Sequence, residues 1–206
     1  AQRGGERGGV FAPLPVHGEG LGVGFYILQD KRSHIMNIFT KWGFTREGWR
    51  NNSRGEYWVL VQGALIVGLI ILPVYRPTWL NLPSSEWLYF TWGIAALLAI
   101  TGLVIFLKGL LDLGQQLTPL PYPIEEGQLV QSGIYSLVRH PVYSGVILAA
   151  FSWTIFQLSL SHLMASAILF AFFDAKANRE ETWLSEKYPD YSDYRQRVKK
   201  LIPWLY

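Results

Sequence analysis

An arginine, a histidine and a proline stand directly before a long uncharged segment, in the stretch SLVRHPVYSG at residues 136–145. Proline is favoured at the first position of an α-helix because its missing N–H group would be unpaired there anyway, so we expect a helix to begin at Pro141. The free N–H groups and the dipole of a helix N-terminus attract an anion, and Arg139 and His140 add hydrogen-bond donors. The pattern indicates an anion-binding site, with a helix cap and basic membrane anchor as the alternative.

A second group of charged residues follows the uncharged segment, in the stretch DAKANREETWL at residues 174–184. Lys176 and Glu180 are four positions apart and therefore share one helix face, whereas Glu181 points about 100° away. We expect Glu180 to bind a ligand and Glu181 to matter less. The alternative is an exposed ion pair, which contributes roughly a few tenths of a kcal/mol.

The two groups meet if the uncharged segment folds back as a helical hairpin, whose outer ends lie together. The run at residues 140–173 has 34 residues. As a single helix it would be about 51 Å long, whereas the core of a bilayer is about 30 Å thick. We expect the turn in the polar stretch QLSLSH at 157–162. Glu180 and Lys176 then face the Arg-His pair across a concave site that suits a zwitterionic ligand, and Gly145 leaves room for that ligand to pack closely.

Long apolar runs predict the elements that position this site. Half of the 206 residues are hydrophobic and only 16% are charged, whereas a soluble domain has about 25% charged residues. Charge-free runs at residues 57–75 and 87–107 match the about 17–25 residues of a transmembrane helix, with a buried helix of a soluble core as the alternative. We predict an all-α polytopic membrane protein with about four transmembrane helices, including a C-terminal helical hairpin, plus interfacial helices. The spans are expected at about 57–75, 88–107, 142–158 and 162–176.

The remaining composition restricts the partners and the domain organisation. The chain has a net charge of +3, and many of its basic residues lie beside the predicted spans. Their distribution predicts cytoplasmic termini and a cytoplasmic active site. We therefore expect the lipid bilayer as a partner and no binding of nucleic acid. With no cysteine and four histidines, we expect no metal site. The Gly-rich residues 1–35 are expected to be a disordered or non-native extension before one domain at 36–206, with Met36 as the start. The prolines within residues 108–139 predict a long functional loop.

The blocks GQLVQSGIYSLVRHPVYSG and REETWLSEKYPDYSDYRQRVKKLIPWL occupy residues 127–145 and 179–205. They resemble the C-terminal half of the isoprenylcysteine carboxyl methyltransferase and phospholipid methyltransferase family of integral membrane enzymes, and the resemblance covers about residues 118–204. The resemblance implies that S-adenosylmethionine binds on the cytoplasmic side and that a lipid-like or prenylated acceptor enters from the membrane. The residues that it assigns to the cofactor are Gln128, Leu129, Val130, Tyr135, His140, Pro141, Val142, Tyr143 and Glu180.

The resemblance also bears on the acceptor. Members that methylate prenylcysteine have an arginine for the substrate carboxylate four residues before the glutamate pair, and this position is Lys176 here. Lysine keeps the charge but lacks the bidentate geometry of a guanidinium group. We therefore predict catalytic roles for Lys176, Glu180 and Arg139 in carboxyl O-methylation of an isoprenylcysteine-like acceptor. A phospholipid amine or a small isoprenoid is the alternative acceptor; an amine must first lose a proton, which His140 can accept only if the cofactor leaves it free.

Two further hypotheses belong to other functional classes. One is an NADPH-dependent reductase of a sterol-like lipid, and the other is a non-enzymatic membrane scaffold. The Glu-Glu pair favours the methyl donor, because the 2′-phosphate of NADPH would need more basic residues around it. Near the C-terminus, Tyr188, Tyr191 and Tyr194 recur every three residues. We expect them to pack against the site, with ligand contact as the alternative.

Overall fold

The computed structural model describes residues 42–78 and 85–206, and these residues fold into helices. The all-α prediction is therefore confirmed for this part of the chain. The helices are α2 (Arg46–Asn51), α3 (Glu56–Ile71), α4 (Ser85–Leu113), α5 (Pro141–Gln157), α6 (Leu160–Lys187) and α7 (Tyr191–Arg197), with 3-10 turns η1 (Gly114–Gln116) and η2 (Gly133–Ser136). The predicted domain boundary at residue 35 and the predicted start at Met36 lie outside the described residues.

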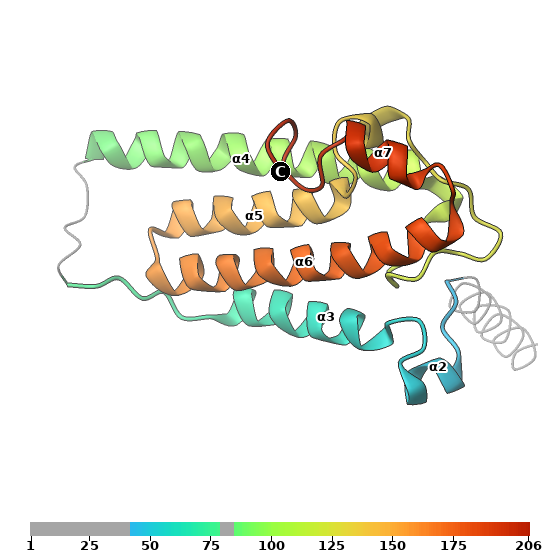
Figure 1. The fold of residues 1–206 in the computed structure, drawn as a ribbon. Coiled ribbons are helices and arrows are strands. Elements are labelled where there is room, and N and C mark those ends of the chain that lie inside the picture. Colours follow the sequence, from blue (N-terminus) through green and yellow to red (C-terminus); the bar gives the residue numbers. More distant parts are fainter. Residues whose placement is uncertain (1–41, 79–84) are drawn as a thin grey trace, which may run out of the picture. The chain divides into compact units, whose positions relative to one another are not determined.

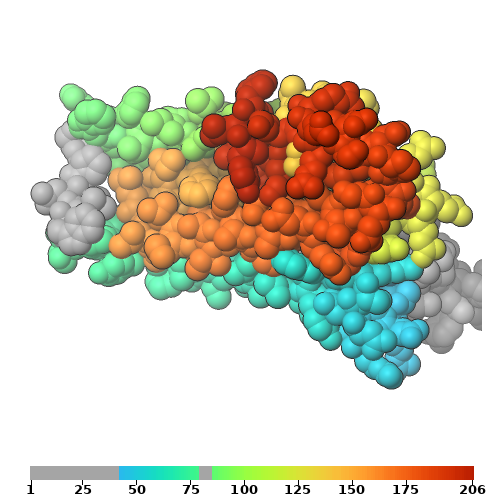
Figure 2. Space-filling model, in the orientation of Figure 1, coloured from blue at the N-terminus to red at the C-terminus, as the bar shows by residue number. Residues whose placement is uncertain are grey.

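Four helices lie side by side in the order α4, α5, α6 and α3 (Figure 1). The hydrophobic core lies between α5 and α6, where Ile147 and Ala150 pack with Leu169 and Phe173, and Leu201 of the C-terminal tail closes it. Helix α7 and the tail lie at the end where α5 begins and α6 ends (Figure 1). In the space-filling view, the C-terminal residues in red lie against the gold residues that precede α5 (Figure 2). This end of the helices holds the predicted site residues.

Two of the helices are long and apolar enough to cross a membrane. They are the segment Ser85–Gln116, which comprises α4 and η1, and α6. In their most apolar stretches only 17% and 33% of the residues are buried, so most apolar side chains point outward, as lipid contact requires. The other two helices, α3 with 16 residues and α5 with 17, measure about 24–26 Å, less than the about 30 Å of a bilayer core. Two membrane-length helices and two shorter apolar helices are thus observed, and four spans stay a prediction.

The predicted helical hairpin is present. Helix α5 begins at Pro141, which occupies its first position, and ends at Leu158, whose backbone is left-handed with φ of 47°. The turn therefore falls within the expected stretch 157–162. Ser159 caps α6 by accepting a hydrogen bond from the backbone N–H of His162, which satisfies one of the donors that a helix N-terminus leaves unpaired.

Helices α4 and α5 cross closely because two glycines face each other. A Cβ atom added to Gly145 would lie 2.6 Å from Cβ of Phe106 and 2.7 Å from the carbonyl oxygen of Gly102, closer than any side chain tolerates. Helix α4 therefore fills the space that a side chain at position 145 would occupy, and the expectation that a ligand packs beside Gly145 stays a prediction. The glycine lets α4 approach α5 and so positions the residues at the end of both helices.

Two helices extend beyond the predicted spans. Helix α4 continues from residue 107 to Leu113, through an i,i+4 ion pair in which Lys108 Nζ lies 3.4 Å from Asp112 Oδ1. It ends at Gly114, whose φ of 51° is left-handed, so the predicted loop at 108–139 begins later. Helix α6 continues past residue 176 to Lys187, because no proline or glycine interrupts it. Its last three turns carry the charged residues into the site.

Candidate functional site

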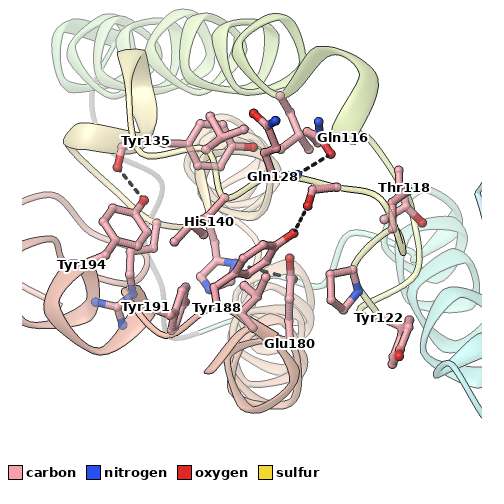
Figure 3. A pocket seen from close by; sticks show the side chains of 18 of the residues that line it. Gln116, Thr118, Tyr122, Gln128, Tyr135, His140, Glu180, Tyr188, Tyr191 and Tyr194 are labelled. Atoms are coloured by element: carbon pink, nitrogen blue, oxygen red, sulfur yellow. Dashed lines mark hydrogen bonds and ion pairs between the residues drawn. The ribbon is translucent and has the colours of Figure 1, made fainter. Parts of the chain in front are cut away.

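A partly open cavity lies where α7, η2 and the loop after α4 meet the end of α6. Its polar and aromatic side chains converge from segments far apart in the sequence (Figure 3). The lining residues that carry polar or charged side chains are Gln116, Thr118, Tyr122, Gln128, Tyr135, Arg139, His140, Glu180, Tyr188, Tyr191 and Tyr194.

Glu181 is the centre of a buried charge cluster beside this cavity. Its side chain is almost fully buried, with the residue 2% exposed. Arg139 Nε donates a hydrogen bond of 2.8 Å to Glu181 Oε1, and His140 Nε2 lies 3.1 Å from the same oxygen. Arg195 Nε lies 3.4 Å from Glu181 Oε2. The Arg-His pair and α7 therefore cover the face of α6 on which Glu181 lies. Glu181 does not line the cavity, and the expectation that it matters less than Glu180 for ligand binding stays a prediction.

Two nitrogens of the Arg139 guanidinium group are bonded inside the protein. Besides the bond of Nε to Glu181, Nη1 donates to the backbone carbonyl of Arg195 at 3.0 Å and to that of Val198. These contacts tie the segment before α5 to α6 and to the end of α7. Arg139 also lines the cavity. Its predicted catalytic role stays a prediction.

Backbone pairing with the C-terminal tail fixes the residues before α5. The N–H group of Arg139 donates to the carbonyl of Lys199 at 2.9 Å, and that of His140 donates to the carbonyl of Lys200 at 3.1 Å. Val138 and Lys199 form an isolated parallel β-bridge. The Arg-His pair is thus held in place by a segment about 60 residues later in the chain, a contact that no local sequence signal indicates.

Glu180 faces the cavity and lies next to two predicted site residues. Its Oε2 accepts a hydrogen bond of 2.7 Å from the hydroxyl of Tyr143 and lies 3.6 Å from Nδ1 of His140. The rings of His140 and Tyr143 stack in parallel, with centroids 5.4 Å apart. The expectation that both ends of the hairpin converge, with Glu180 a few ångströms from His140 and Tyr143, is confirmed. The carboxylate is 26% exposed and keeps one oxygen for a ligand.

Most of the residues assigned to the cofactor by resemblance line the cavity, and three do not. The lining includes Gln128, Leu129, Val130, Tyr135, His140 and Glu180. Pro141 and Val142 instead pack against Gly109 of α4, where an added Cβ would lie 3.1 Å from each. Tyr143 reaches the site through its hydroxyl bond to Glu180. The cofactor contacts of all nine residues stay predictions.

Lys176 lies one helical turn before Glu180 but not in the cavity wall. The residue is 1% exposed. Its Nζ donates to the side-chain oxygen of Gln62 in α3 at 2.6 Å and to the carbonyl of Pro119 at 3.0 Å, and it lies 5.2 Å from the ring centroid of Tyr143. The sequence contains one signal for this contact, because Gln62 is a polar residue within the apolar helix α3. Polar groups in apolar helices need a partner. The ammonium group thus joins three segments.

Two of the three C-terminal tyrosines pack against the site through their hydroxyl groups, as expected. Tyr194 donates to the carbonyl of Tyr135 at 2.6 Å, and Tyr188 donates to the carbonyl of Gly127 at 2.7 Å. Burial, and then the negative charge of Glu180, raises the pKa of the Tyr135 hydroxyl. Burial likewise raises the pKa of Tyr194. These hydroxyl groups therefore stay protonated at neutral pH and act as hydrogen-bond donors in the cavity wall.

The donor set fits an organic ligand with charged, polar and apolar parts. A carboxylate, phenolic hydroxyl groups and the amide groups of residues 128–130 supply the polar contacts, while Leu113, Leu120 and Leu184 supply apolar surface. Among the residues that the structure describes, no group of three or more His, Cys, Asp or Glu side chains is placed to hold a metal ion.

Comparison with known proteins gives one matching family and several similar proteins. Residues 90–191 match the model of the phospholipid methyltransferase family. A probable protein-S-isoprenylcysteine O-methyltransferase of Oryza sativa subsp. indica is 27% identical over 127 residues, which cover 60% of this chain and 66% of that protein. The protein-S-isoprenylcysteine O-methyltransferase of Schizosaccharomyces pombe is 36% identical over 79 residues, which cover 37% and 34%.

A bacterial protein with a different acceptor in its name also matches. Methanethiol S-methyltransferase 1 of Bradyrhizobium diazoefficiens is 36% identical over 72 residues, which cover 34% of this chain and 25% of that protein. The matched part of this chain thus spans less than two thirds of the length of each of these relatives. All three names describe transfer of a methyl group.

Proposed function

Because the chain belongs to the family of membrane methyltransferases that includes the phospholipid and isoprenylcysteine enzymes, we propose that it methylates a lipid-like acceptor with S-adenosylmethionine as donor. One observation carries the proposal. Tyr135, His140 and Glu180, together with residues 128–130, converge on one cavity at the end of apolar helices. The proposed reaction resembles that of the isoprenylcysteine carboxyl O-methyltransferases.

The residues around the cavity fit this donor. Glu180 has a carboxylate oxygen for the donor's amino or hydroxyl groups, and its other oxygen is fixed by Tyr143. Residues 128–130 offer peptide and side-chain amide groups to a nucleoside, and the leucines offer apolar contact. When bound, the donor supplies a methyl group that is already activated by the positive charge on its sulfur.

The protein then has to position the acceptor and exclude water, which are large contributions to rate. A carboxylate or thiolate acceptor needs no general base. An amine acceptor needs one, and His140 is the candidate. Its Nε2 lies 3.1 Å from Glu181, its Nδ1 lies 3.6 Å from Glu180, and its ring stacks on Tyr143. This engagement favours an acceptor that arrives as an anion, such as a prenylcysteine carboxylate at a membrane surface on the cytoplasmic side.

A phospholipid amine is the second candidate acceptor, because one observation favours it. The ammonium group of Lys176 is bonded to Gln62 and to the carbonyl of Pro119, so two of its three donors are engaged within the protein. An anionic acceptor would have to use the remaining donor. The name of the matching family model, phospholipid methyltransferase, fits the same alternative.

Calorimetry on the purified full chain in detergent tests the proposed cofactor. S-adenosylhomocysteine is expected to bind, because it keeps the nucleoside and amino acid parts of the donor and lacks only the methyl group and the positive charge on sulfur, and NADPH is expected not to bind. Among the described residues of the cavity wall, Arg139 is the only arginine or lysine, and it already binds Glu181. Binding of NADPH without S-adenosylhomocysteine would support the reductase hypothesis instead, and binding of neither would leave the scaffold hypothesis.

Lys176→Gln is expected to lower turnover with an anionic carboxylate acceptor by about 10- to 100-fold, the scale of one hydrogen bond to a charged group. The affinity for S-adenosylhomocysteine should stay nearly unchanged, because Lys176 does not line the cavity. Methyl transfer from radiolabelled donor to a prenylcysteine analogue measures this, and Lys176→Arg is expected to retain activity.

Lys108→Gln is the matched control, since Lys108 is an exposed lysine at the end of α4. Full activity of Lys176→Gln toward carboxylate acceptors would rule out a role for Lys176 in binding the acceptor. If the wild-type protein methylates no carboxylate acceptor, the phospholipid amine is the remaining acceptor, and Lys176→Gln should leave its methylation unchanged or improve it, because the cation no longer opposes an amine.

A further inference from the structure

Tyr191 differs from the other tyrosines of the cavity wall. It is the first residue of α7 and is 1% exposed. In the close view it lies between Tyr194 and Tyr188 along the wall (Figure 3). Its ring packs edge-to-face with Tyr194, with centroids 5.8 Å apart. All three tyrosines line the cavity, so their hydroxyl groups can be compared directly.

The hydroxyl group of Tyr191 has no hydrogen-bond partner among residues 42–78 and 85–206. The hydroxyl groups of Tyr188 and Tyr194 each donate to a backbone carbonyl. Buried polar atoms are nearly always paired in folded proteins, and an unpaired one destabilises the fold. A buried hydroxyl that is unpaired in the wall of a binding cavity therefore points to a partner that arrives with a ligand.

The charges around Tyr191 restrict what that partner is. Burial, and then the charge of Glu181, raises the pKa of the Tyr191 hydroxyl, so the group keeps its proton and both donates and accepts. The carboxylates of Glu180 and Glu181 and the guanidinium group of Arg139 act on it electrostatically, with opposite signs. A neutral hydroxyl group or ring nitrogen of the ligand can pair with the Tyr191 hydroxyl without adding a further charge to this cluster.

We propose that the Tyr191 hydroxyl binds the nucleoside part of the methyl donor, through a hydrogen bond to a ribose hydroxyl or an adenine nitrogen. This inference rests on the proposed function and extends it to a residue that neither the Arg-His-Pro stretch nor the glutamate pair includes. The hydroxyl groups of Tyr188 and Tyr194 then stabilise the cavity wall, and the hydroxyl group of Tyr191 binds the ligand.

Tyr191→Phe is expected to weaken the binding of S-adenosylhomocysteine by about 3- to 10-fold, the scale of one neutral hydrogen bond. The binding of 5′-methylthioadenosine, which has the nucleoside but no amino acid, should weaken by the same factor. The melting temperature of the ligand-free protein should be unchanged or higher, because the variant removes an unpaired buried hydroxyl. Calorimetry and thermal unfolding of the full chain in detergent give these values.

Tyr188→Phe and Tyr194→Phe are the matched controls, because each removes a hydroxyl that is bonded inside the protein. Both are expected to lower the melting temperature of the ligand-free protein. A Tyr191→Phe variant that melts at a lower temperature and binds S-adenosylhomocysteine normally would overturn the inference. That result would mean that a water molecule links the hydroxyl to Glu181, whose Oε2 is also buried without a hydrogen bond.

The outcome separates this inference from the proposed function. If the wild-type protein does not bind S-adenosylhomocysteine, the proposed function fails and the inference fails with it. If the wild-type protein binds and Tyr191→Phe binds equally well, only the inference fails. If 5′-methylthioadenosine binding is unchanged while S-adenosylhomocysteine binding weakens, the contact is to the amino acid part and the assignment to the nucleoside is overturned.

Discussion

Glu181→Ala is expected to destabilise the protein by about 3–5 kcal/mol, the scale of removing one partner from a buried ion pair. The carboxylate is almost fully buried and holds Arg139 and His140 on the same oxygen. Without it, the guanidinium group of Arg139 and the imidazole of His140 lose their acceptor inside the protein. The contact through Glu181 that joins the segment before α5 to α6 and α7 is then lost. We therefore expect methyl transfer to be lost together with the stability of the fold.

Denaturant unfolding of the purified protein in detergent measures this loss, with Glu186→Ala as the control. Glu186 is an exposed glutamate on the same helix, and its replacement should change the free energy of unfolding by less than about 0.5 kcal/mol. A double-mutant cycle with Arg139→Met should show coupling, because the two side chains share one contact. Equal stability of the Glu181 and Glu186 variants would contradict the buried cluster.

Glu180→Ala is expected to weaken the binding of S-adenosylhomocysteine by about 1.5–3 kcal/mol, which is the contribution of a hydrogen bond to a charged group. This corresponds to about 10- to 160-fold in affinity. The free energy of unfolding should change little, because the carboxylate is partly exposed and bonds only the hydroxyl of Tyr143 within hydrogen-bond distance. Calorimetry and unfolding of the same preparation separate the two effects.

Tyr143→Phe is the companion variant, since it leaves the carboxylate in place and removes the hydroxyl that orients it. Its effect on affinity should be smaller than that of Glu180→Ala. The two adjacent glutamates are thus expected to behave in opposite ways, with Glu180 acting on ligand affinity and Glu181 on stability. Small and equal effects at both positions would mean that neither side chain belongs to the site.

Local signals in the sequence were sufficient for the hairpin. Proline at a first helical position, a polar stretch within a long uncharged run and four-residue spacing all act within a few residues, and the structure has α5 beginning at Pro141 and the turn at Leu158. The ends of the helices were predicted less well. A fall in hydrophobicity marked residues 107 and 176 as ends, but hydrogen bonding along a helix continues until a glycine, a proline or a cap interrupts it.

Residue spacing was sufficient to predict that Glu180 shares a helix face with Lys176, that both follow a hairpin and that the hairpin returns them to the Arg-His pair. The residues that cover each face could not be predicted in this way, because they come from distant parts of the chain. Arg139 and Arg195 close over Glu181, the tail pairs with the backbone of His140, and Gln62 in α3 takes the ammonium group of Lys176. Helical periodicity specifies which side chains point the same way, whereas the partner of each depends on contacts between segments up to 114 residues apart.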